Sequence, residues 1–344
     1  MRRRTRSTFA ILLLVLAALA VAVYLRKQAP PEAARLLPEA DAIVYFNLKP
    51  LRALAHFEQH PVPHSAEYQA FLDATGIQVE RDLDEAAFAI HRMPNANGPN
   101  GPAAYSEVFV GHFDGARLTQ YLATQAADTE SYAGHTIYRI PIEGRNVRVT
   151  ILGYEMVAAS NTPTPEQIHS IIDRHHTAAL PFSGSTLLAQ HYPDVPLLAQ
   201  AWGIGKIGLP FAGGHPLSLL GIPLPLPVDT TFIASIRYLG SLHLRVEEIT
   251  PDAGSAQDST RVAGVALQVL RSMLPSDTSQ NSVQDAASLP LATFLNSATV
   301  EQKGNRVLLR ATVPVSLLED LVSSKDTTPA DTPAPADTDP AMKP

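Results

Sequence analysis

One long apolar run opens the hydrophobic pattern of the chain. Residues Thr8–Leu25 read TFAILLLVLAALAVAVYL, eighteen residues without a charge. As a helix with a rise of about 1.5 Å per residue, the run spans roughly 27 Å, which is close to the hydrocarbon thickness of a bilayer. Four arginines precede it, and Arg26-Lys27 follow. Because the more basic end stays in the cytoplasm, the pattern predicts that the remaining chain lies outside.

A cleaved signal peptide is the alternative interpretation of this run. Ala18-Leu19-Ala20 matches an A-x-A cleavage site. The apolar run continues through Val21–Leu25, however, whereas a peptidase site normally lies in polar, extended chain. We therefore expect residues 1–27 to form a basic cytoplasmic end and a single-pass signal-anchor in the cytoplasmic membrane, with a periplasmic body.

A second pattern recurs along the body: an apolar, β-rich run, a turn and a short amphipathic helix. Its first copy is Ala42–Leu54, in which Pro50 is expected at the first helical position. The second copy is Glu107–Leu122, in which Asp114 is a candidate N-cap. The third copy is Val307–Leu321. Apolar residues at helical spacing follow the turn in each copy, so each predicts a strand followed by a helix.

Further alternating runs, joined by short glycine-containing turns, predict hairpins. Longer helices are expected at Pro165–Arg174 and Ser255–Met273. Strands that follow one another through tight turns pair antiparallel, so we predict an α+β fold with mostly antiparallel sheets and covering helices. The expected hairpin strands are Thr136–Ile140, Asn146–Leu152, Met156–Ser160, Thr231–Leu239, Ser241–Ile249, Ala298–Gln302 and Arg306–Val313.

The composition of the chain changes at both ends of this body. Residues 28–35 (QAPPEAAR) form a proline-bearing stalk, and residues 325–344 (KDTTPADTPAPADTDPAMKP) are rich in Pro, Asp and Thr. Such a tail has little to bury, so we expect it to be disordered with polyproline character. The body is predicted to consist of two similar α+β halves, residues 36–180 and 181–324. An internal duplication is a hypothesis.

The first copy of the recurring pattern also carries a family resemblance. Leu36–Leu54 reads LLPEADAIVYFNLKPLRAL, and Phe113–Leu118 reads FDGARL. These segments resemble those of uncharacterised, single-pass, envelope-anchored bacterial proteins with a domain of unknown function. The resemblance implies the anchored architecture and carries no activity. Asn47 stands where an aspartate is common in that family, which argues against a catalytic carboxylate at this position.

Composition and charge exclude several classes of function. The chain has 344 residues and no cysteine, which excludes disulfides, thiol nucleophiles, Cys-zinc sites and lipobox lipidation. It is 45% hydrophobic and 17% charged, which is typical of a chain with a packed core. Beyond residue 27 it carries 20 Lys and Arg against 33 Asp and Glu. An acidic body is repelled by phosphate backbones, so we expect no nucleic-acid partner.

Gly203-Ile-Gly205-Lys-Ile-Gly208 matches the dinucleotide motif G-x-G-x-x-G. A real dinucleotide loop leads from a strand into a helix whose N-terminus holds pyrophosphate. Here Pro210 and Pro216 flank two further glycines, so no helix is expected. We interpret Ala201–Ile207 as a strand in which glycine lets another backbone approach closely. We therefore expect no cofactor.

Two clusters of histidines are candidate metal sites. Histidines four apart on a helix can share a zinc ion. In the first cluster Pro61 and Pro63 end the helix, and the second cluster is followed directly by Thr177. We expect solvated helix ends and no metal at either. The alternative is a zinc site for the first cluster and a metal or acid–base site for the second. The clusters are His56, His60 and His64, and His169, Asp173, His175 and His176.

The acidic pairs are poorly placed for catalysis. Asp82 and Asp84-Glu85 lie in a charged turn, and Glu247 and Glu248 are strand neighbours that point to opposite faces. The chain contains no G-x-S-x-G, H-E-x-x-H, P-loop or S-x-x-K motif. We therefore expect no catalytic residues and no enzyme activity.

The most unusual segment of the body is Gly208–Val228, GLPFAGGHPLSLLGIPLPLPV, which has five prolines and no charge. It must be buried, lie on a membrane or contact a partner, because exposed apolar patches usually mark binding sites. Our leading hypothesis is a non-enzymatic, membrane-anchored extracytoplasmic protein that binds another envelope protein. The alternatives are binding of a lipid or small apolar ligand, and a metal-dependent hydrolase. The candidate partner-binding residues are Phe211, Leu217, Leu219, Leu220, Ile222, Leu224 and Leu226.

Overall fold

The structure is a computed structural model that describes residues 29–55, 65–98, 101–142, 144–177, 184–206, 218–219, 222–223, 230–273 and 285–314. Within these ranges, none of the helices combines the length and the apolar character needed to cross a membrane. The predicted anchor Thr8–Leu25, the tail 325–344 and the first histidine cluster lie outside the described residues. Of the candidate partner-binding residues, only Leu219 and Ile222 lie inside, where they pair in two short strands.

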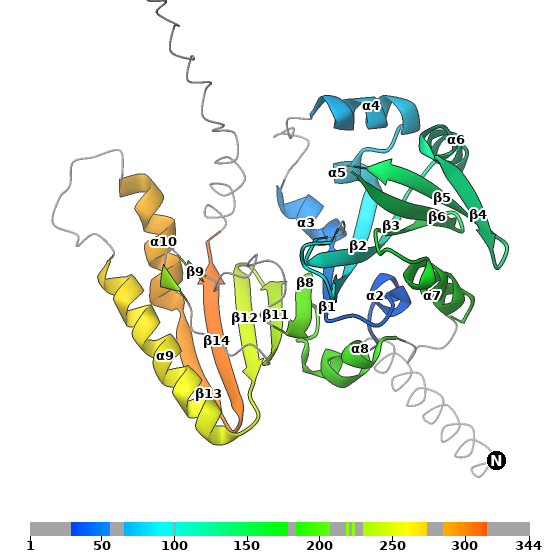
Figure 1. Cartoon of the computed structure of the whole chain (residues 1–344). Coiled ribbons are helices and arrows are strands. Elements are labelled where there is room, and N and C mark those ends of the chain that lie inside the picture. Colours follow the sequence, from blue (N-terminus) through cyan, green and yellow to red (C-terminus); the bar gives the residue numbers. More distant parts are fainter. Residues whose placement is uncertain are drawn as a thin grey trace, which may run out of the picture.

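Alternating apolar and polar positions form long strands, and the helices follow the turns between them (Figure 1). The helices are α2 (Glu32–Leu36), α3 (Leu48–Ala55), α4 (Ala66–Thr75), α5 (Val79–Asp82), α6 (Gly115–Gln125), α7 (Glu166–His176), α8 (Thr186–His191), the 3₁₀ turn η1 (Tyr192–Asp194), α9 (Ala253–Ser272) and α10 (Asp285–Ser297). The strands are β1 (Ala42–Asn47), β2 (Leu83–Arg92), β3 (Ala103–Gly111), β4 (Asp128–Tyr132), β5 (His135–Ile142), β6 (Arg145–Leu152), β7 (Met156–Ser160), β8 (Ala201–Lys206), β9 (Ser218–Leu219), β10 (Ile222–Pro223), β11 (Thr231–Tyr238), β12 (Leu242–Ile249), β13 (Thr299–Lys303) and β14 (Arg306–Val313).

One sheet contains all of these strands except β9 and β10. Its order is β13-β14-β12-β11-β8-β1-β2-β3-β7-β6-β5-β4. Each pair of neighbouring strands is antiparallel. The α+β class with a large antiparallel sheet and helices is therefore confirmed. The predicted hairpins β5–β6, β6–β7, β11–β12 and β13–β14 are all present.

The strands in the two halves of the sheet are connected in the same order. β1 is followed by the hairpin β2–β3, then a helix, and then a return in which the last strand, β7, lies beside β3. β8 is followed by β11–β12, then helices, and then a return in which the last strand, β14, lies beside β12. The first strands of the two halves, β1 and β8, pair in the middle of the sheet. The internal duplication itself stays a prediction.

Asp114 and Pro50, two residues expected at helix starts, can be compared with the structure. Asp114 is the N-cap of α6, and its carboxylate accepts hydrogen bonds of 3.1 Å from the N–H groups of Ala116 and Arg117. The expected position of Pro50 is wrong, because α3 begins at Leu48 and Pro50 is its third residue. Proline is tolerated there because N–H groups in the first turn have no intrahelical acceptor. The helix expected after Pro314 lies outside the described residues.

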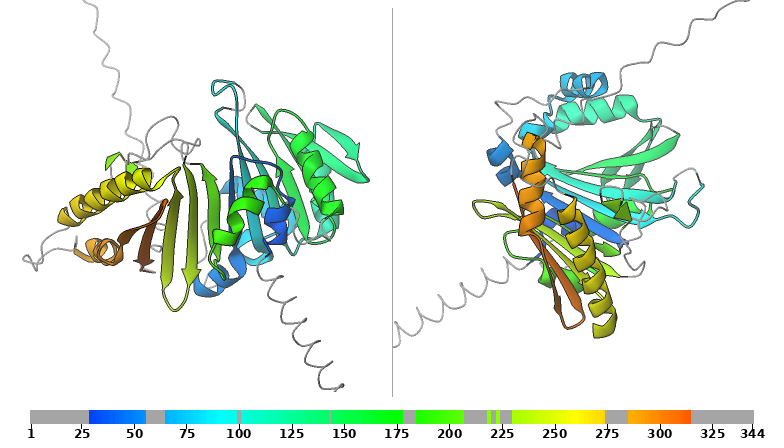
Figure 2. Two further views of the ribbon diagram at one scale, coloured as in Figure 1. Left: turned by 90° about the horizontal axis from the view of Figure 1, so that it is seen from below. Right: turned by 90° about the vertical axis from the view of Figure 1, so that its left-hand side faces the viewer.

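The strand residues alternate between two covered faces. On one face, α2 and α8 pack over the central strands, and α7 packs over β6 and β7 (Figure 2). Ile168, Ile171 and Ile172 of α7 are fully buried in this layer. On the other face, Leu118 and Leu122 of α6 pack with Tyr138 of β5. Helices α9 and α10 pack at the far end, over β13 and β14. The pocket described below lies on the first face, where β1 and β8 meet.

The glycines of the dinucleotide-like motif lie in β8, between β1 and β11. A Cβ atom added to Gly205 would lie 2.3 Å from the Cβ of Ala42, so only glycine fits at this position. At Gly203 the nearest atoms are 3.7 Å away, so that glycine has room. The strand and the close backbone approach are therefore confirmed, the latter at Gly205 alone. Gly208 lies outside the described residues.

Candidate binding pocket

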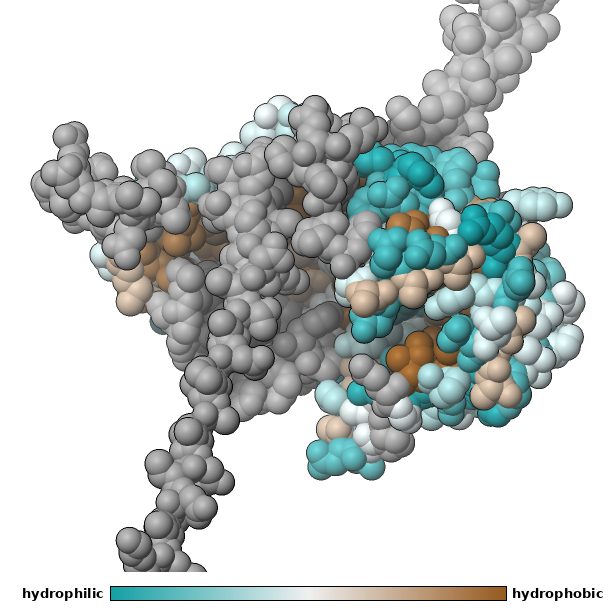
Figure 3. All heavy atoms as spheres, turned by 90° about the horizontal axis from the view of Figure 1, so that it is seen from above, coloured by the Kyte–Doolittle hydropathy of each residue, from teal (hydrophilic) through white to brown (hydrophobic). Residues whose placement is uncertain are grey.

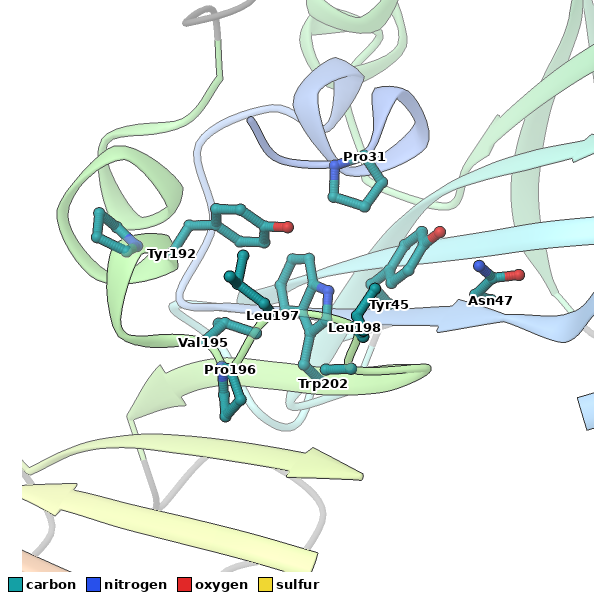
Figure 4. Close-up of a pocket in the computed structure, with 11 residues that line it drawn as sticks. Pro31, Tyr45, Asn47, Tyr192, Val195, Pro196, Leu197, Leu198 and Trp202 are labelled. Atoms are coloured by element: carbon teal, nitrogen blue, oxygen red, sulfur yellow. The ribbon is translucent and has the colours of Figure 1, made fainter. Parts of the chain in front are cut away.

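A pocket of about 230 Å³ lies at the end of β1 where β8 begins (Figure 4). Four segments that are distant in the sequence form it: the residue before α2, the end of β1, η1 with the loop that follows it, and the start of β8. Most of the side chains are aromatic, aliphatic or proline. The lining residues are Pro31, Tyr45, Asn47, Tyr192, Pro193, Val195, Pro196, Leu197, Leu198, Ala199 and Trp202.

Three aromatic rings form the wall of the pocket. Tyr45 and Trp202 are direct cross-strand partners, and their rings stack with centroids 5.4 Å apart. Tyr192 from η1 meets Trp202 edge-on at 5.3 Å. Such pairs contribute about 0.5–1.5 kcal/mol each beyond the burial of their area. The indole is 3% exposed, so this wall is packed into the core and is rigid.

Two leucines at the edge of the pocket are exposed. Leu197 is 54% and Leu198 is 73% exposed, although both side chains are apolar. Leu198 has φ of +64°, in the left-handed region that a leucine enters only at a cost of roughly 1 kcal/mol or more. The loop therefore holds two apolar side chains toward solvent and retains backbone strain at one of them. Exposed apolar side chains that border a pocket are typical of binding surfaces.

The pocket also contains a polar group without a partner. The side-chain Oδ1 of Asn47 is buried and accepts no hydrogen bond from the residues that the structure describes. The backbone N–H of Asn47 is satisfied, because it donates to the carbonyl of Gln200 at 2.6 Å. A buried acceptor without a donor costs about 1–3 kcal/mol. A ligand with an N–H or O–H group would remove that cost only if the Asn47 side chain rotated toward the pocket.

The electrostatics keep the aromatic wall neutral. Burial raises the pKa of Tyr45, and the neighbouring Glu85 carboxylate, to which the phenol is hydrogen-bonded, raises it further. Burial also raises the pKa of Tyr192. Burial raises the pKa of Glu85 itself, while its hydrogen bond to Tyr45 opposes that rise. Both phenols therefore stay protonated at physiological pH, and the wall presents uncharged rings.

Other exposed apolar side chains lie on α9 and at its end, at Val262, Val265, Val269 and Met273. On the face in Figure 3, hydrophilic residues cover most of the N-terminal half, with smaller hydrophobic areas between them. A second pocket, of about 370 Å³, is polar and lies beside β4, β5 and β6. Its Arg139 is paired with Asp128, and its Arg148 donates to the carbonyls of Thr162 and Pro163. The charges of this second pocket are thus already satisfied.

The second predicted histidine cluster separates into two groups. The Nε2 of His169 lies 2.7 Å from the Glu130 carboxylate, and its ring stacks on Tyr132 at 3.7 Å. The carboxylate of Asp173 accepts a hydrogen bond of 3.0 Å from the hydroxyl of Tyr132. These side chains attach α7 to β4, which is a structural role.

His175 and His176 meet His135 from β5, with ring centroids 5.4–6.1 Å apart. Burial and the two neighbouring imidazoles lower the pKa of His175. His135 and His176 each have a ring nitrogen 3.2 Å from a backbone carbonyl. In the part of the chain that the structure describes, no group of three or more His, Asp or Glu side chains could hold a metal ion.

A buried serine–histidine contact was not anticipated from the sequence. The Nε2 of His91 lies 2.9 Å from the Oγ of Ser106, which continues to Ser160 at 3.1 Å and to Thr162 at 2.9 Å. This resembles the pairing of a nucleophile and a base, but the side chain of Ser106 has no exposed surface. A substrate cannot reach it. The chain of hydrogen bonds joins β2, β3 and β7 inside the core.

The acidic pairs singled out from the sequence are ion-paired or hydrogen-bonded in the structure. Asp84 lies 3.0 Å from Lys49 and 3.4 Å from Arg52, at the start of β2 rather than in the expected turn. Glu247 pairs with Arg306 at 2.6 Å on one face of the sheet. Glu248 accepts a hydrogen bond of 3.1 Å from Ser259 of α9 on the other face. The predicted opposite orientation of the two glutamates is confirmed.

Comparison with known proteins gives structural neighbours alone. No protein-family model and no curated protein matches the chain. Three crystal forms of TP0453 are similar, with TM-scores of 0.44, 0.40 and 0.43 and identities of 11%, 10% and 13%. The match covers 86% of this chain and 99%, 98% and 96% of those chains. At this level the similarity carries no conclusion about a site or a function.

Proposed function

We propose that this chain is a non-enzymatic, single-pass protein of the bacterial envelope whose extracytoplasmic body binds another envelope protein. The uncharged segment Thr8–Leu25 with its flanking basic residues supports the anchor and the orientation. The aromatic pocket with its exposed leucines supports the binding role, and it is the observation that carries the proposal. The partner would insert apolar side chains between Tyr192, Trp202 and the leucines.

The size of the pocket favours a protein segment as its ligand. Pockets for small molecules and cofactors typically have volumes of about 300–1,000 Å³. The pocket of about 230 Å³ is smaller, and one or two side chains fill it. A whole lipid would not fit. Aromatic residues in a well-packed pocket are the residue types that carry most of the energy at protein interfaces.

The apolar segment Gly208–Val228 is proposed as a second contact on sequence grounds alone. Its seven candidate residues run from Phe211 to Leu226. Changing Leu217, Leu219 and Leu220 to Asp is expected to lower the recovery of the partner while the body stays folded. Unchanged recovery from a well-folded variant would remove this segment from the proposal.

The test of the proposed function is cross-linking of the full chain in native membranes, followed by purification. The wild-type chain is expected to bring along one envelope protein in stoichiometric amount. A variant with Leu197→Asp and Leu198→Asp should lose that protein by tenfold or more, because two charges would enter an apolar contact. Tyr154→Asp, at a turn residue that is 94% exposed, is the matched control and should retain it. Equal recovery from all three chains would contradict the proposal.

The two alternative functions have direct tests. Solvent extraction and mass spectrometry of the purified chain detect a bound lipid or small apolar molecule, and a stoichiometric compound would replace the protein partner. Metal analysis after dialysis tests whether the chain is a metal-dependent hydrolase. One retained equivalent of metal would support a metal site at one of the histidine clusters.

A further inference from the structure

We propose that the proline-rich segment Thr327–Pro340 (TTPADTPAPADTDP) docks in the aromatic pocket of its own chain, in the polyproline II conformation. This inference rests on the proposed function, because it assigns a competing occupant to the same pocket. A partner would then have to displace the segment, so the chain would regulate its own binding site.

Three prolines of this chain, Pro31, Pro193 and Pro196, line the pocket. Pro31 lines it with φ of −53° and ψ of 149°, which are polyproline II angles. Figure 4 shows Pro31 above the rings of Tyr45 and Trp202. Grooves lined by aromatic side chains recognise proline-rich segments because the extended conformation is formed in advance and little entropy is lost on docking. The wall of stacked and edge-on rings beside Pro31 is of this type.

The chain leaves the sheet at the same end as the pocket. Val313, the last residue of β14, pairs with Leu242 of β12, which pairs with Tyr238 of β11. The N–H of Tyr238 donates to the side chain of Gln200 at 2.7 Å, and Gln200 directly precedes β8. Three strand spacings separate β14 from β8, which is about 14 Å.

The length of the chain makes docking within one molecule possible. Pro329 lies fifteen residues after Pro314 in the sequence. In the polyproline II conformation they span about 46 Å, and as an α-helix they still span about 22 Å. Either length exceeds the distance to be crossed. The segment therefore reaches the pocket without strain.

The surface between the two points suits this segment. Leu239, in the turn between β11 and β12, is 59% exposed and lies at this end of the sheet. Arg245 and Arg310 extend the cross-strand row that begins at Trp202 and passes through Ser235. Both guanidinium groups are partly accessible, and each pairs with a glutamate, Glu247 and Glu301. The segment carries aspartates between its prolines. In the proposed docking, the aspartates of the segment would lie beside two arginines that already pair with glutamates, so the exposed leucine and the prolines would supply the contact.

The unpartnered oxygen of Asn47 fits the same occupant. A polyproline II segment makes no internal hydrogen bonds, so the N–H of each residue other than proline is free to donate. Ala334, between Pro333 and Pro335, has such an N–H. The Oδ1 of Asn47 is buried, so the side chain would have to rotate toward the segment before the N–H of Ala334 could donate to it.

The experiment uses Trp202, which is the single tryptophan of the chain. The full chain is labelled with 5-fluorotryptophan, so its ¹⁹F spectrum reports on the pocket wall alone. Replacing Pro329, Pro333 and Pro335 by Ala is expected to shift the resonance by more than its linewidth. Adding a synthetic peptide of residues 327–340 to that variant should restore the wild-type position. Replacing Thr327, Thr332 and Thr338 by Ala in the same segment is the matched control and should cause no shift.

Each result decides the proposal. An unchanged resonance in the triple proline variant would overturn it. A wild-type resonance position that depends on protein concentration would mean that a second copy supplies the segment, and would overturn docking within one chain. If the proline variant shows no shift but the leucine variant still loses the partner, the pocket is a partner site without this regulation. If the shift occurs but the variant with Leu197→Asp and Leu198→Asp recovers the partner as well as the wild type does, the docking is supported and the proposed function is contradicted.

Discussion

The surroundings of Trp202 and of His91 differ in how far their side chains are buried and hydrogen-bonded. At the pocket, apolar leucines are exposed, Leu198 has a strained backbone, and the Oδ1 of Asn47 lacks a donor. Around His91, the polar side chains are buried, and each one described in the chain from His91 to Thr162 is hydrogen-bonded. Groups left unsatisfied or strained indicate binding, whereas a buried and satisfied network indicates a role in folding.

The largest expected effect comes from removing the aromatic wall. Trp202→Ala deletes a side chain that is packed among Tyr45, Tyr192 and the core, and should lower the free energy of unfolding by about 3–5 kcal/mol. It should also abolish recovery of the partner. Chemical denaturation measures the first effect. A variant with wild-type stability would show that the pocket wall does not belong to the core.

A smaller effect should follow from breaking the buried network. Ser106→Ala removes the partner of both His91 and Ser160, and should lower the free energy of unfolding by about 1–3 kcal/mol. Because this network is separate from the pocket, partner recovery should stay at the wild-type level in the folded protein. A loss of partner recovery without a loss of stability would assign Ser106 a functional role. It would contradict the assignment of the buried network to folding alone.

The pH dependence of stability sharpens the same comparison. Burial lowers the pKa of His91 below its ordinary value of 6.5, while the Asp41 carboxylate and the Glu39 backbone carbonyl oppose that shift. As pH falls below 6.5, His91 takes up a proton in the unfolded chain, whereas in the folded chain it does so only at lower pH. His91 therefore lowers the free energy of unfolding as pH falls from 7 to 5. His91→Gln should reduce that loss of stability. Chemical denaturation of the wild type and the variant at pH 5, 6 and 7 measures the contribution of His91 to the pH dependence of stability, because the two proteins share all other titratable groups.

The smallest expected effect has the opposite sign. Leu198→Gly removes the strain of a positive φ at an exposed position and should raise the free energy of unfolding by up to about 1 kcal/mol. The same change should weaken recovery of the partner, because it deletes an apolar contact. Leu197→Gly, at a residue without a positive φ, should give no stabilisation and is the control. A destabilised Leu198→Gly variant would show that the leucine packs internally rather than binding.

Local patterns predicted most of the hairpins, because alternation and glycine turns are properties of neighbouring residues. Asp114 was identified as a cap for the same reason. Strand β4 was not predicted, because its residues Asp128–Tyr132 are mostly exposed and polar and show no apolar alternation. Helix α10 was also missed, and its proline at position 290 is an unfavourable residue inside a helix.

The pocket could not be found by motif, because its lining comes from four separate segments. Tyr45 and Trp202 become neighbours only through the pairing of β1 with β8. The one local signal was Pro196-Leu197-Leu198, an apolar run just before a strand that carries the single tryptophan. The contact of His91 with Ser106 likewise depends on the pairing of β2 with β3. Side chains that meet through sheet pairing have no fixed spacing in the sequence, so a sequence motif cannot identify them.

The most direct test of the central claim places a photo-cross-linking amino acid at position 198 of the full chain in native membranes. The account predicts that illumination joins this position to the same envelope protein that Leu197 and Leu198 are needed to recover. It also predicts that the same amino acid at position 154 captures none of that protein. Equal capture from both positions, or no protein captured from position 198, would contradict the claim that the aromatic pocket is the binding site.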